Sequence, residues 1–414
     1  MKLPTPRTPL PFAELVLLLA ALMSIMAFSI DSMLPAMPEI TRVMSPDDAT
    51  RVQLVIGAFI LGAGVGQLFI GPLSDSYGRR VALLFGMTLF IVGAWGGRGA
   101  DSLETLLAFR FLQGLGAAAP RTVSQAINRD LFSGRAMARV SSLTFMFFVL
   151  VPAVAPWIGQ HIVAGFGWRA MFTVYMLLGA GVLAWFWLRQ PETLAPEARR
   201  PFHPAKVARA MAEVLRAPVA FRYLVVMTLG FGQLIAYISA AQPIYVDALG
   251  AGDKFPLYFA FVALLSAVSG FVNARLVMRM GMRLLASVAF GSQAILALMF
   301  WGLWASGLLE MLADGAPLWG FVGWSVTLFF MNGLTFGNLN ALAMEPLGHI
   351  AGTASAVLGA LSSVFGVAIA MPISMAFNGT PVPLIMGVAV CSALAFGLIW
   401  TDRQRERDAP QIDT

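Results

Sequence analysis

Long apolar runs recur along the whole chain and leave few folds open to it. Divided at charges and at proline and glycine breaks, the sequence holds twelve runs, near 13–36, 51–71, 81–98, 103–127, 138–164, 169–188, 219–242, 255–275, 283–306, 317–342, 353–376 and 381–401. A helix needs about 20 mostly apolar residues to cross a bilayer. The runs do not alternate apolar with polar residues, so they predict helices rather than barrel strands. We therefore expect an all-α polytopic membrane protein with twelve transmembrane helices.

The composition agrees with a membrane protein and narrows its chemistry. Charged residues make up 12% of the chain, against about 25% in a soluble protein. The one cysteine, Cys391, lies in the last apolar run, which argues against a disulfide framework and a thiol metal site. Nothing matches the ATP-binding P-loop pattern. Energy for pumping would then come from an ion gradient, and we expect no cofactor and no metal.

The basic residues indicate how the chain lies in the membrane. With the N-terminus inside, 20 of the 27 Lys and Arg residues fall in inner segments and five in outer segments. Arg110 and Arg121 remain, both within a predicted helix. Because Lys and Arg gather in cytoplasmic loops, we expect both termini in the cytoplasm. The net charge of +6 then follows from topology, and we do not expect nucleic-acid binding.

One polar stretch divides the chain into halves. Residues 189–218 are predicted to be a cytoplasmic connector between a six-helix half at 1–188 and another at 219–401. Residues 402–414 would be a cytoplasmic tail. Within the connector, 204–216 could form an amphipathic helix on the inner membrane surface. Six helices on each side of the connector suggest an internal repeat.

A short charged segment, residues 71–80, joins the second and third runs. So tight a connection makes these two helices antiparallel neighbours, with Asp75, Gly78, Arg79 and Arg80 at one membrane face. Two interpretations stay open. The arginines could serve only as a topogenic signal, or Asp75 and the arginines could form a gate latch that binds the end of a neighbouring helix in one conformation and releases it in another.

A weaker copy of this segment lies between the eighth and ninth runs. Gly281 and Arg283 keep the glycine and the second arginine, but Met278 stands where the copy of Asp75 would be. The second half would thus lack the acidic member of the latch. Control of closure is expected to be concentrated in the first half.

Asp31 and Arg110 are the candidates for proton coupling. Asp31 lies near the outer end of the first run, and an acid at mid-bilayer costs about 2.5–3.5 kcal/mol. Desolvation favours the neutral carboxyl, as a proton carrier requires. Arg110 lies about 10 Å inside the fourth run at 1.5 Å per residue, so we predict that the two pair directly or through water. The alternatives are an interfacial acid without a role and an arginine that snorkels to the headgroups.

Further candidates for gating lie on the fourth and fifth runs. Arg121 could be a gate residue or a headgroup anchor. Pro152 and Pro156 would bend the fifth helix and free backbone carbonyls, which makes a bend about which the halves could seal. His161 is a further candidate, but an interfacial histidine without a role is the simpler interpretation.

The substrate cavity is expected between the halves at mid-membrane. The candidates for lining it are polar, aromatic or methionine side chains on inward-facing runs: Met26, Phe59, Gln113, Gln233, Tyr237, Gln293, Asn332 and Asn338. Polar members of this set are also common as hydrogen-bond partners between helices.

Two of these segments resemble signatures of the major facilitator superfamily. The order of residues 71–80 resembles the loop between helices 2 and 3 of that family. Residues 110–116 resemble its helix 4 proton-antiporter signature, in which Gln113, Gly114 and Gly116 match. The resemblance implies the twelve-helix fold of that family, with two six-helix halves.

The fifth run resembles the helix 5 antiporter signature of the same family. Pro156 and Gly159 match this signature, whereas Val151, Ala155 and Gln160 replace glycines. The resemblance implies that Gly159 belongs with the prolines of the gating bend.

Other segments are similar to the Bcr/CflA type of drug/proton antiporter within that family. They are residues 31–40, 129–132, 155–156, 167–172 and 348–355. The resemblance implies a bacterial inner-membrane exporter of small amphipathic drugs, exchanged for protons.

We therefore expect a monomeric transporter, not an enzyme, that works by alternating access. Its partners would be a small-molecule substrate, protons and the lipid bilayer. Two other functions remain open: a dedicated exporter of one metabolite or siderophore, and a proton-coupled uptake symporter. No cluster of nucleophile, base and orienting residue points to catalysis.

Overall fold

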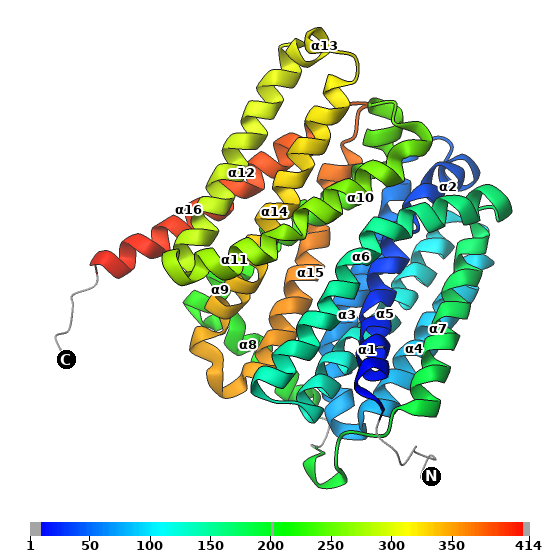
Figure 1. Cartoon of the computed structure of the whole chain (residues 1–414), viewed down its shortest axis with the longest axis vertical. Coiled ribbons are helices and arrows are strands. Elements are labelled where there is room, and N and C mark those ends of the chain that lie inside the picture. Colours follow the sequence, from blue (N-terminus) through cyan, green and yellow to red (C-terminus); the bar gives the residue numbers. More distant parts are fainter. Residues whose placement is uncertain (1–9, 200–202, 409–414) are drawn as a thin grey trace. The chain divides into compact units, whose positions relative to one another are not determined.

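The computed structural model describes residues 10–199 and 203–408. Within these residues every regular element is a helix (Figure 1). Ten helical segments are long and apolar enough to span a bilayer. Two more, α5 (Leu103–Leu131) and α14 (Ala316–Met344), have 29 residues each but a lower hydropathy. Together these segments coincide with the twelve predicted runs, so the prediction of an all-α membrane protein is confirmed.

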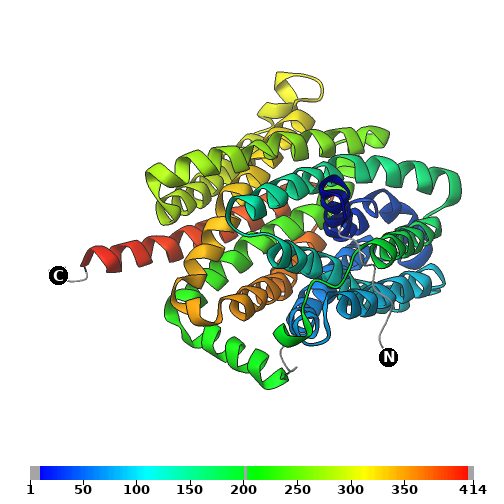
Figure 2. The same cartoon turned by 60° about the horizontal axis from the view of Figure 1, so that its bottom comes forward.

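The chain forms two compact units, residues 1–209 and 210–414. The long helices of the first unit lie side by side in both views, coloured blue to green (Figure 2). Besides α5, this unit contains α1 (Phe12–Asp31), η1 (Leu34–Ala36), α2 (Met37–Met44), η2 (Ala49–Gln53), α3 (Leu54–Tyr77), α4 (Arg79–Arg98), α6 (Gly134–Phe166), α7 (Arg169–Arg189) and η3 (Pro196–Ala198).

The second unit is also helical in the residues that the structure describes. Besides α14, it contains α9 (Pro218–Pro243), η4 (Ile244–Ala248), η5 (Gly252–Lys254), α10 (Phe255–Ser266), α11 (Val268–Met280), α12 (Met282–Ala305), α13 (Leu308–Leu312), η6 (Glu345–Ile350), α15 (Ala351–Met375) and α16 (Val382–Asp408). The amphipathic segment predicted in the connector is a helix with the predicted bounds, α8 (Pro204–Arg216).

Two predicted runs are interrupted for local reasons. The run near 13–36 is one helix only as far as Asp31, because Pro35 and Pro38 then begin the short helices η1 and α2. Proline suits the first turn of a helix, where its missing N–H is not needed. The run near 255–275 divides where Ser266 turns its hydroxyl back onto the carbonyl of Val262, a bond that bends helices.

Glycines bring α5 close to its neighbours. A Cβ at Gly114 would overlap the backbone carbonyl of Phe59 on α3, and a Cβ at Gly116 would overlap the backbone of Phe90 on α4. Small residues permit such approach between membrane helices. The contact also sets the position of Arg110, which lies one turn before Gly114 and faces α3.

Candidate functional site

Arg110 is fully buried and hydrogen-bonded to neutral groups. Its guanidinium donates to the backbone carbonyl of Ser29 at 3.1 Å, to that of Val55 at 3.4 Å and to Oε1 of Gln113 at 2.8 Å. The ring of Phe59 lies 4.4 Å from the guanidinium carbon. Arg110 therefore joins α5 to α1 and α3, and its positive charge faces acceptors that carry no charge.

Asp31 is the last residue of α1 and is 4% exposed. Among the described residues, nothing donates a hydrogen bond to its carboxyl group and no cation pairs with it. The direct pair predicted between Asp31 and Arg110 is therefore not formed here. Backbone carbonyls that end α1 and line α3 take the place of the carboxylate as acceptors for the guanidinium.

The neighbourhood of Asp31 holds two residues that sequence reasoning missed. Ser32 follows α1 as its C-cap residue, and its hydroxyl shares a hydrogen bond of 2.9 Å with the hydroxyl of Tyr175 on α7. Both residues are buried, and the ring of Tyr175 packs edge-on against Phe28. A single buried tyrosine within an apolar run gives no sign of its partner 143 residues away.

The fifth run packs against the end of α1. A Cβ at Gly159 on α6 would overlap the carbonyl group of Ser32, so α6 touches the backbone beside Asp31. Pro156, one turn earlier, is buried, and Pro152 is half-buried within the same helix. The structure thus brings Gly159, a predicted gating residue, to the candidate proton site. His161 is exposed, and its Nδ1 contacts the carbonyl of Trp157 at 2.9 Å.

The connection at residues 71–80 is shorter than predicted. α3 continues to Tyr77 and α4 begins at Arg79, so Gly78 alone separates them. The φ angle of Gly78 is +98°, and a Cβ there would lie 2.6 Å from a carboxylate oxygen of Glu192. Only glycine adopts this backbone readily, and one such residue is enough to reverse the chain.

Arg79 has two acidic partners. Its guanidinium donates to both carboxylate oxygens of Asp130, at 2.8 and 3.1 Å, and to Asp75 at 2.5 Å. The side chain of Arg79 is 3% exposed, whereas that of Asp75 is 46% exposed. Burial raises the pKa of Asp130, but hydrogen bonds from Arg79 and Thr193 outweigh burial, and the pKa lies below its usual range.

Glu192, from the segment after α7, closes the start of α4. Its two carboxylate oxygens accept the backbone N–H groups of Arg79 at 3.0 Å and of Arg80 at 3.1 Å. The guanidinium of Arg80 donates to the carbonyls of Gln190 and Trp187 and lies over the Trp187 ring. Both arginines therefore bind the ends of neighbouring helices, as the latch interpretation requires.

Arg121 lies apart from this cluster. It is half-buried on α5 and has no hydrogen bond or ion pair with the described residues. Its assignment to the gate stays a prediction.

The corresponding connection in the second unit also has acidic partners, contrary to the prediction from Met278. Arg283 donates to Glu345 at 3.2 Å and lies 3.8 Å from Asp402. Asp402 also pairs with Arg222 and accepts a hydrogen bond from Tyr223 at 2.8 Å. Met278 itself is 85% exposed. The acids come from elements distant in sequence, which comparing the two loops could not reveal.

Two of the three predicted substrate residues of the first unit surround Arg110. Phe59 and Gln113 contact Arg110, as described above, and Met26 is half-buried on α1. The Gln113 side-chain nitrogen is buried and has no partner among the described residues.

In the second unit most of the predicted residues hold helices together. Gln233 accepts from Ser392 at 2.8 Å, and the hydroxyl of Tyr237 contacts that of Tyr245 at 3.1 Å. Asn338 donates to Asn273 at 2.8 Å, at the contact of α14 with α11.

Gln233, Gln293 and Asn332 each keep a buried polar atom that has no partner among the described residues, and in Gln233 this atom is the amide nitrogen. The amide nitrogen of Gln293 and the amide oxygen of Asn332 are buried and unpaired within the part of the chain that the structure describes. Gln293 also lines a cavity of about 320 Å³ between α12 and α14, beside Ser292 and Thr327.

Comparison with known proteins identifies the class of protein that these features define. A sequence profile described as Major Facilitator Superfamily matches residues 17–371. A bicyclomycin resistance protein homolog of Haemophilus influenzae is 29% identical, over 95% of this chain and 97% of its own length. A chloramphenicol resistance protein of Pseudomonas aeruginosa is also 29% identical, over 94% and 91% of the two chains. Multidrug resistance protein D of Escherichia coli is 27% identical, over 85% and 86%.

Solved structures show the same fold. The crystal structure of a D-xylose-proton symporter superposes with a TM-score of 0.70 at 16% identity, over 93% of this chain and 97% of its own. The chain belongs to the major facilitator superfamily. The twelve-helix fold with two six-helix halves predicted from the sequence is therefore confirmed, and the protein is a multi-pass membrane protein.

Proposed function

We propose that this protein is an exporter of the bacterial inner membrane that exchanges small amphipathic drugs for protons by alternating access. Both termini would lie in the cytoplasm. The names of the relatives in H. influenzae and P. aeruginosa make bicyclomycin and chloramphenicol the first candidate substrates. The observation that carries the proposal is Asp31, a buried carboxyl group at the end of a membrane helix with no partner among the described residues.

A carboxyl group in this position can couple proton transfer to movement. An intramembrane acid is expensive and is usually retained for function. No cation holds Asp31 in its charged form here, so gain or loss of a proton changes what this side chain can bind. Arg110 is the nearby charge that would respond, because its present acceptors at Ser29, Val55 and Gln113 are neutral.

The coupling would run through the contact between α1 and α5. Loss of the proton from Asp31 would draw the Arg110 guanidinium away from the Ser29 carbonyl and into an ion pair. Gly159 and Ser32, in backbone contact beside Asp31, would transmit this rearrangement to α6. Binding of the next proton would restore the neutral acceptors of Arg110.

The cluster around Arg79 would hold the opposite end of the first unit in one of its two states. Arg79, Asp75 and Asp130 join α3, α4 and α5, and Glu192 joins α4 to the connector. We take this cluster to be the gate latch, which stabilises one facing state and opens in the other.

Transport in everted membrane vesicles tests the proposal. With an imposed pH gradient, wild-type vesicles should accumulate chloramphenicol or bicyclomycin, and Asp31→Asn should reduce uptake to the level of vesicles without the protein. Asp101→Asn, in the exposed connection before α5, is the matched control and should transport normally. Undiminished proton-driven uptake by Asp31→Asn, at equal protein in the membrane, would refute the role of Asp31.

A further inference from the structure

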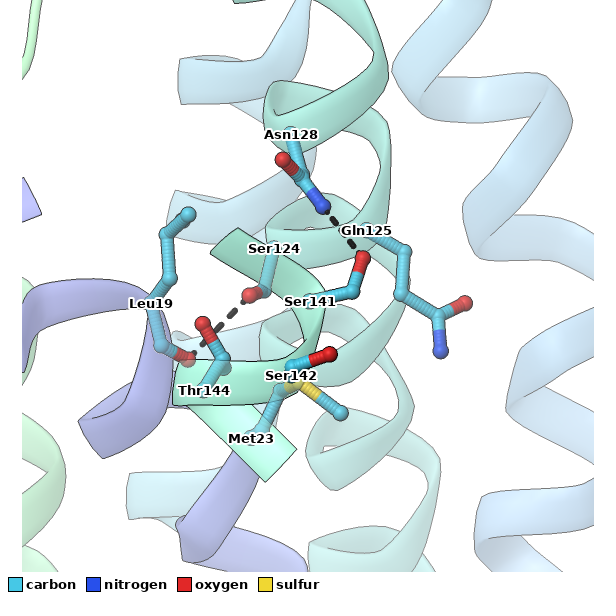
Figure 3. Close-up of a pocket in the computed structure, with 8 residues that line it drawn as sticks. All are labelled: Leu19, Met23, Ser124, Gln125, Asn128, Ser141, Ser142 and Thr144. Atoms are coloured by element: carbon cyan, nitrogen blue, oxygen red, sulfur yellow. Dashed lines mark hydrogen bonds between the residues drawn. The ribbon is translucent and has the colours of Figure 1, made fainter. Parts of the chain in front are cut away.

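A cavity of about 350 Å³ lies between α1, α5 and α6, within the first unit (Figure 3). Among the described residues that line it, none carries a charge. Two are apolar, Leu19 and Met23 on α1. The other six bear a hydroxyl or an amide: Ser124, Gln125, Asn128, Ser141, Ser142 and Thr144. None of these eight residues was among the predicted substrate residues.

The lining residues form a buried floor and an accessible rim. Ser124, Asn128 and Thr144 are buried, whereas Gln125 and Ser142 are exposed. A ligand can therefore enter the cavity past the rim, and the polar atoms at its floor are shielded from bulk water.

Part of the polar floor is already satisfied by the protein. The Ser124 hydroxyl donates to the carbonyl of Leu19 at 3.1 Å, and the Asn128 amide donates to the Ser141 hydroxyl at 2.7 Å. Both bonds are drawn in Figure 3, which shows the Asn128 and Ser141 side chains pointing toward each other.

Two floor atoms have no such partner. Among the described residues, nothing bonds the amide oxygen of Asn128 or the hydroxyl of Thr144. A helical threonine usually returns its hydroxyl to a carbonyl one turn earlier, and Thr144 does not. Buried polar groups are nearly always hydrogen-bonded to protein, water or ligand. The Asn128 oxygen needs a donor, and the Thr144 hydroxyl offers both a donor and an acceptor.

We propose that this cavity is a substrate subsite for uncharged compounds that carry hydroxyl and amide groups, and that it discriminates against lipophilic cations. The inference rests on the proposed function as a drug exporter and names the substrate class. A neutral ligand would place its polar groups on Asn128 and Thr144 and an apolar face on Leu19 and Met23. A lipophilic cation would find no carboxylate among the described lining residues to balance its charge, so the same cavity would reject it.

Equilibrium binding to the purified full chain tests the inference. The probes are radiolabelled chloramphenicol, a neutral compound with two hydroxyls and one amide, and tetraphenylphosphonium, a lipophilic cation. Wild type should bind chloramphenicol, and tetraphenylphosphonium should not displace it. Thr144→Val removes the hydroxyl and keeps the shape, and should weaken chloramphenicol binding about two- to tenfold, as expected for one neutral hydrogen bond.

Thermal stability separates binding from folding in this variant. Because no described residue bonds the Thr144 hydroxyl, Thr144→Val should melt at or above the wild-type temperature. Thr88→Val is the matched control, since Thr88 lies on α4 and bonds its own helix at Leu84; it should bind like wild type. Gln125→Glu places an acid at the rim and should create binding of tetraphenylphosphonium.

Three results would overturn the subsite: no binding of chloramphenicol by wild type, displacement of chloramphenicol by tetraphenylphosphonium, or unchanged affinity in Thr144→Val. Failure of the proposed function looks different, because it would leave binding intact and abolish pH-driven transport in wild-type vesicles. If transport of a drug depends on Asp31 but its binding affinity is unchanged in Thr144→Val, the proposed export function stands and the proposed subsite is refuted.

Discussion

The carboxylate of Glu192 accepts the backbone N–H of Arg79 at 3.0 Å, across 113 residues of sequence. The other carboxylate oxygen accepts the next backbone N–H, that of Arg80. Glu192 therefore caps the start of α4, although it does not belong to that helix. An acid at a helix N-terminus also interacts favourably with the helix dipole. The segment that follows α7 is thereby attached to the connection between α3 and α4.

Removal of this cap should loosen the start of α4. We expect Glu192→Ala to lower the free energy of unfolding by about 0.5–2 kcal/mol, the usual effect of losing a cap. Thermal unfolding of the purified protein measures the change. Glu197→Ala, an exposed acid in the same connector, is the control. Equal melting temperatures for Glu192→Ala and wild type would show that the cap contributes nothing.

The ion pair between Asp130 and Arg79 should make a contribution to stability that depends on pH only under acidic conditions. The pKa of Asp130 is lowered in the folded state, so its contribution is fully present above the ordinary aspartate pKa of about 3.9. That contribution is lost as the pH falls through the lower folded-state pKa. The difference in melting temperature between wild type and Asp130→Asn should stay constant from about pH 5 to 8 and shrink below about pH 4.

This pattern also separates the latch from the proton site. Any dependence of transport on pH between about 5 and 8 should remain in Asp130→Asn and disappear in Asp31→Asn, because the Asp130 carboxylate keeps its charge throughout that range. A stability difference that changes near neutral pH would contradict the assignment for Asp130.

Asp75 should affect turnover more than affinity or stability. Its side chain is 46% exposed, and an exposed ion pair contributes about 1 kcal/mol or less. We expect Asp75→Ala to fold normally and to lower kcat for efflux with KM nearly unchanged. Ser76→Ala, which removes only a bond to the carbonyl of Pro72, is the control. A rise in KM alone would argue against a gating role.

Gly159 should tolerate no side chain. A Cβ there would overlap the carbonyl of Ser32, so Gly159→Ala should push α6 away from the end of α1 and reduce both stability and transport. Gly165→Ala is the control on the same helix, because a Cβ at Gly165 meets open space. That change should be neutral or stabilising by about 0.5–1 kcal/mol, the helix preference for alanine over glycine. Equal stability and equal transport in the two variants would show that close packing at Gly159 is not required.

The sequence by itself determined the helical membrane fold, because the hydrogen bonds of a membrane helix are local and its apolar length is legible in one run of residues. The sequence also placed a chain reversal within residues 71–80, and the structure located it at Gly78. The loop and helix signatures were enough to indicate the family.

Only the tertiary structure decided which groups meet. Glu192 and Asp130 reach Arg79 from other elements, the carbonyls of Ser29 and Val55 take the place predicted for Asp31, and Ser32 finds Tyr175. Contacts between residues distant in the sequence depend on how the helices pack. Every residue has a backbone carbonyl, so the residue type does not predict which carbonyl will accept a side-chain hydrogen bond. The cavity lined by Asn128 and Thr144 stayed hidden for the same reason: its serines, threonine and amides become one site only where three helices converge.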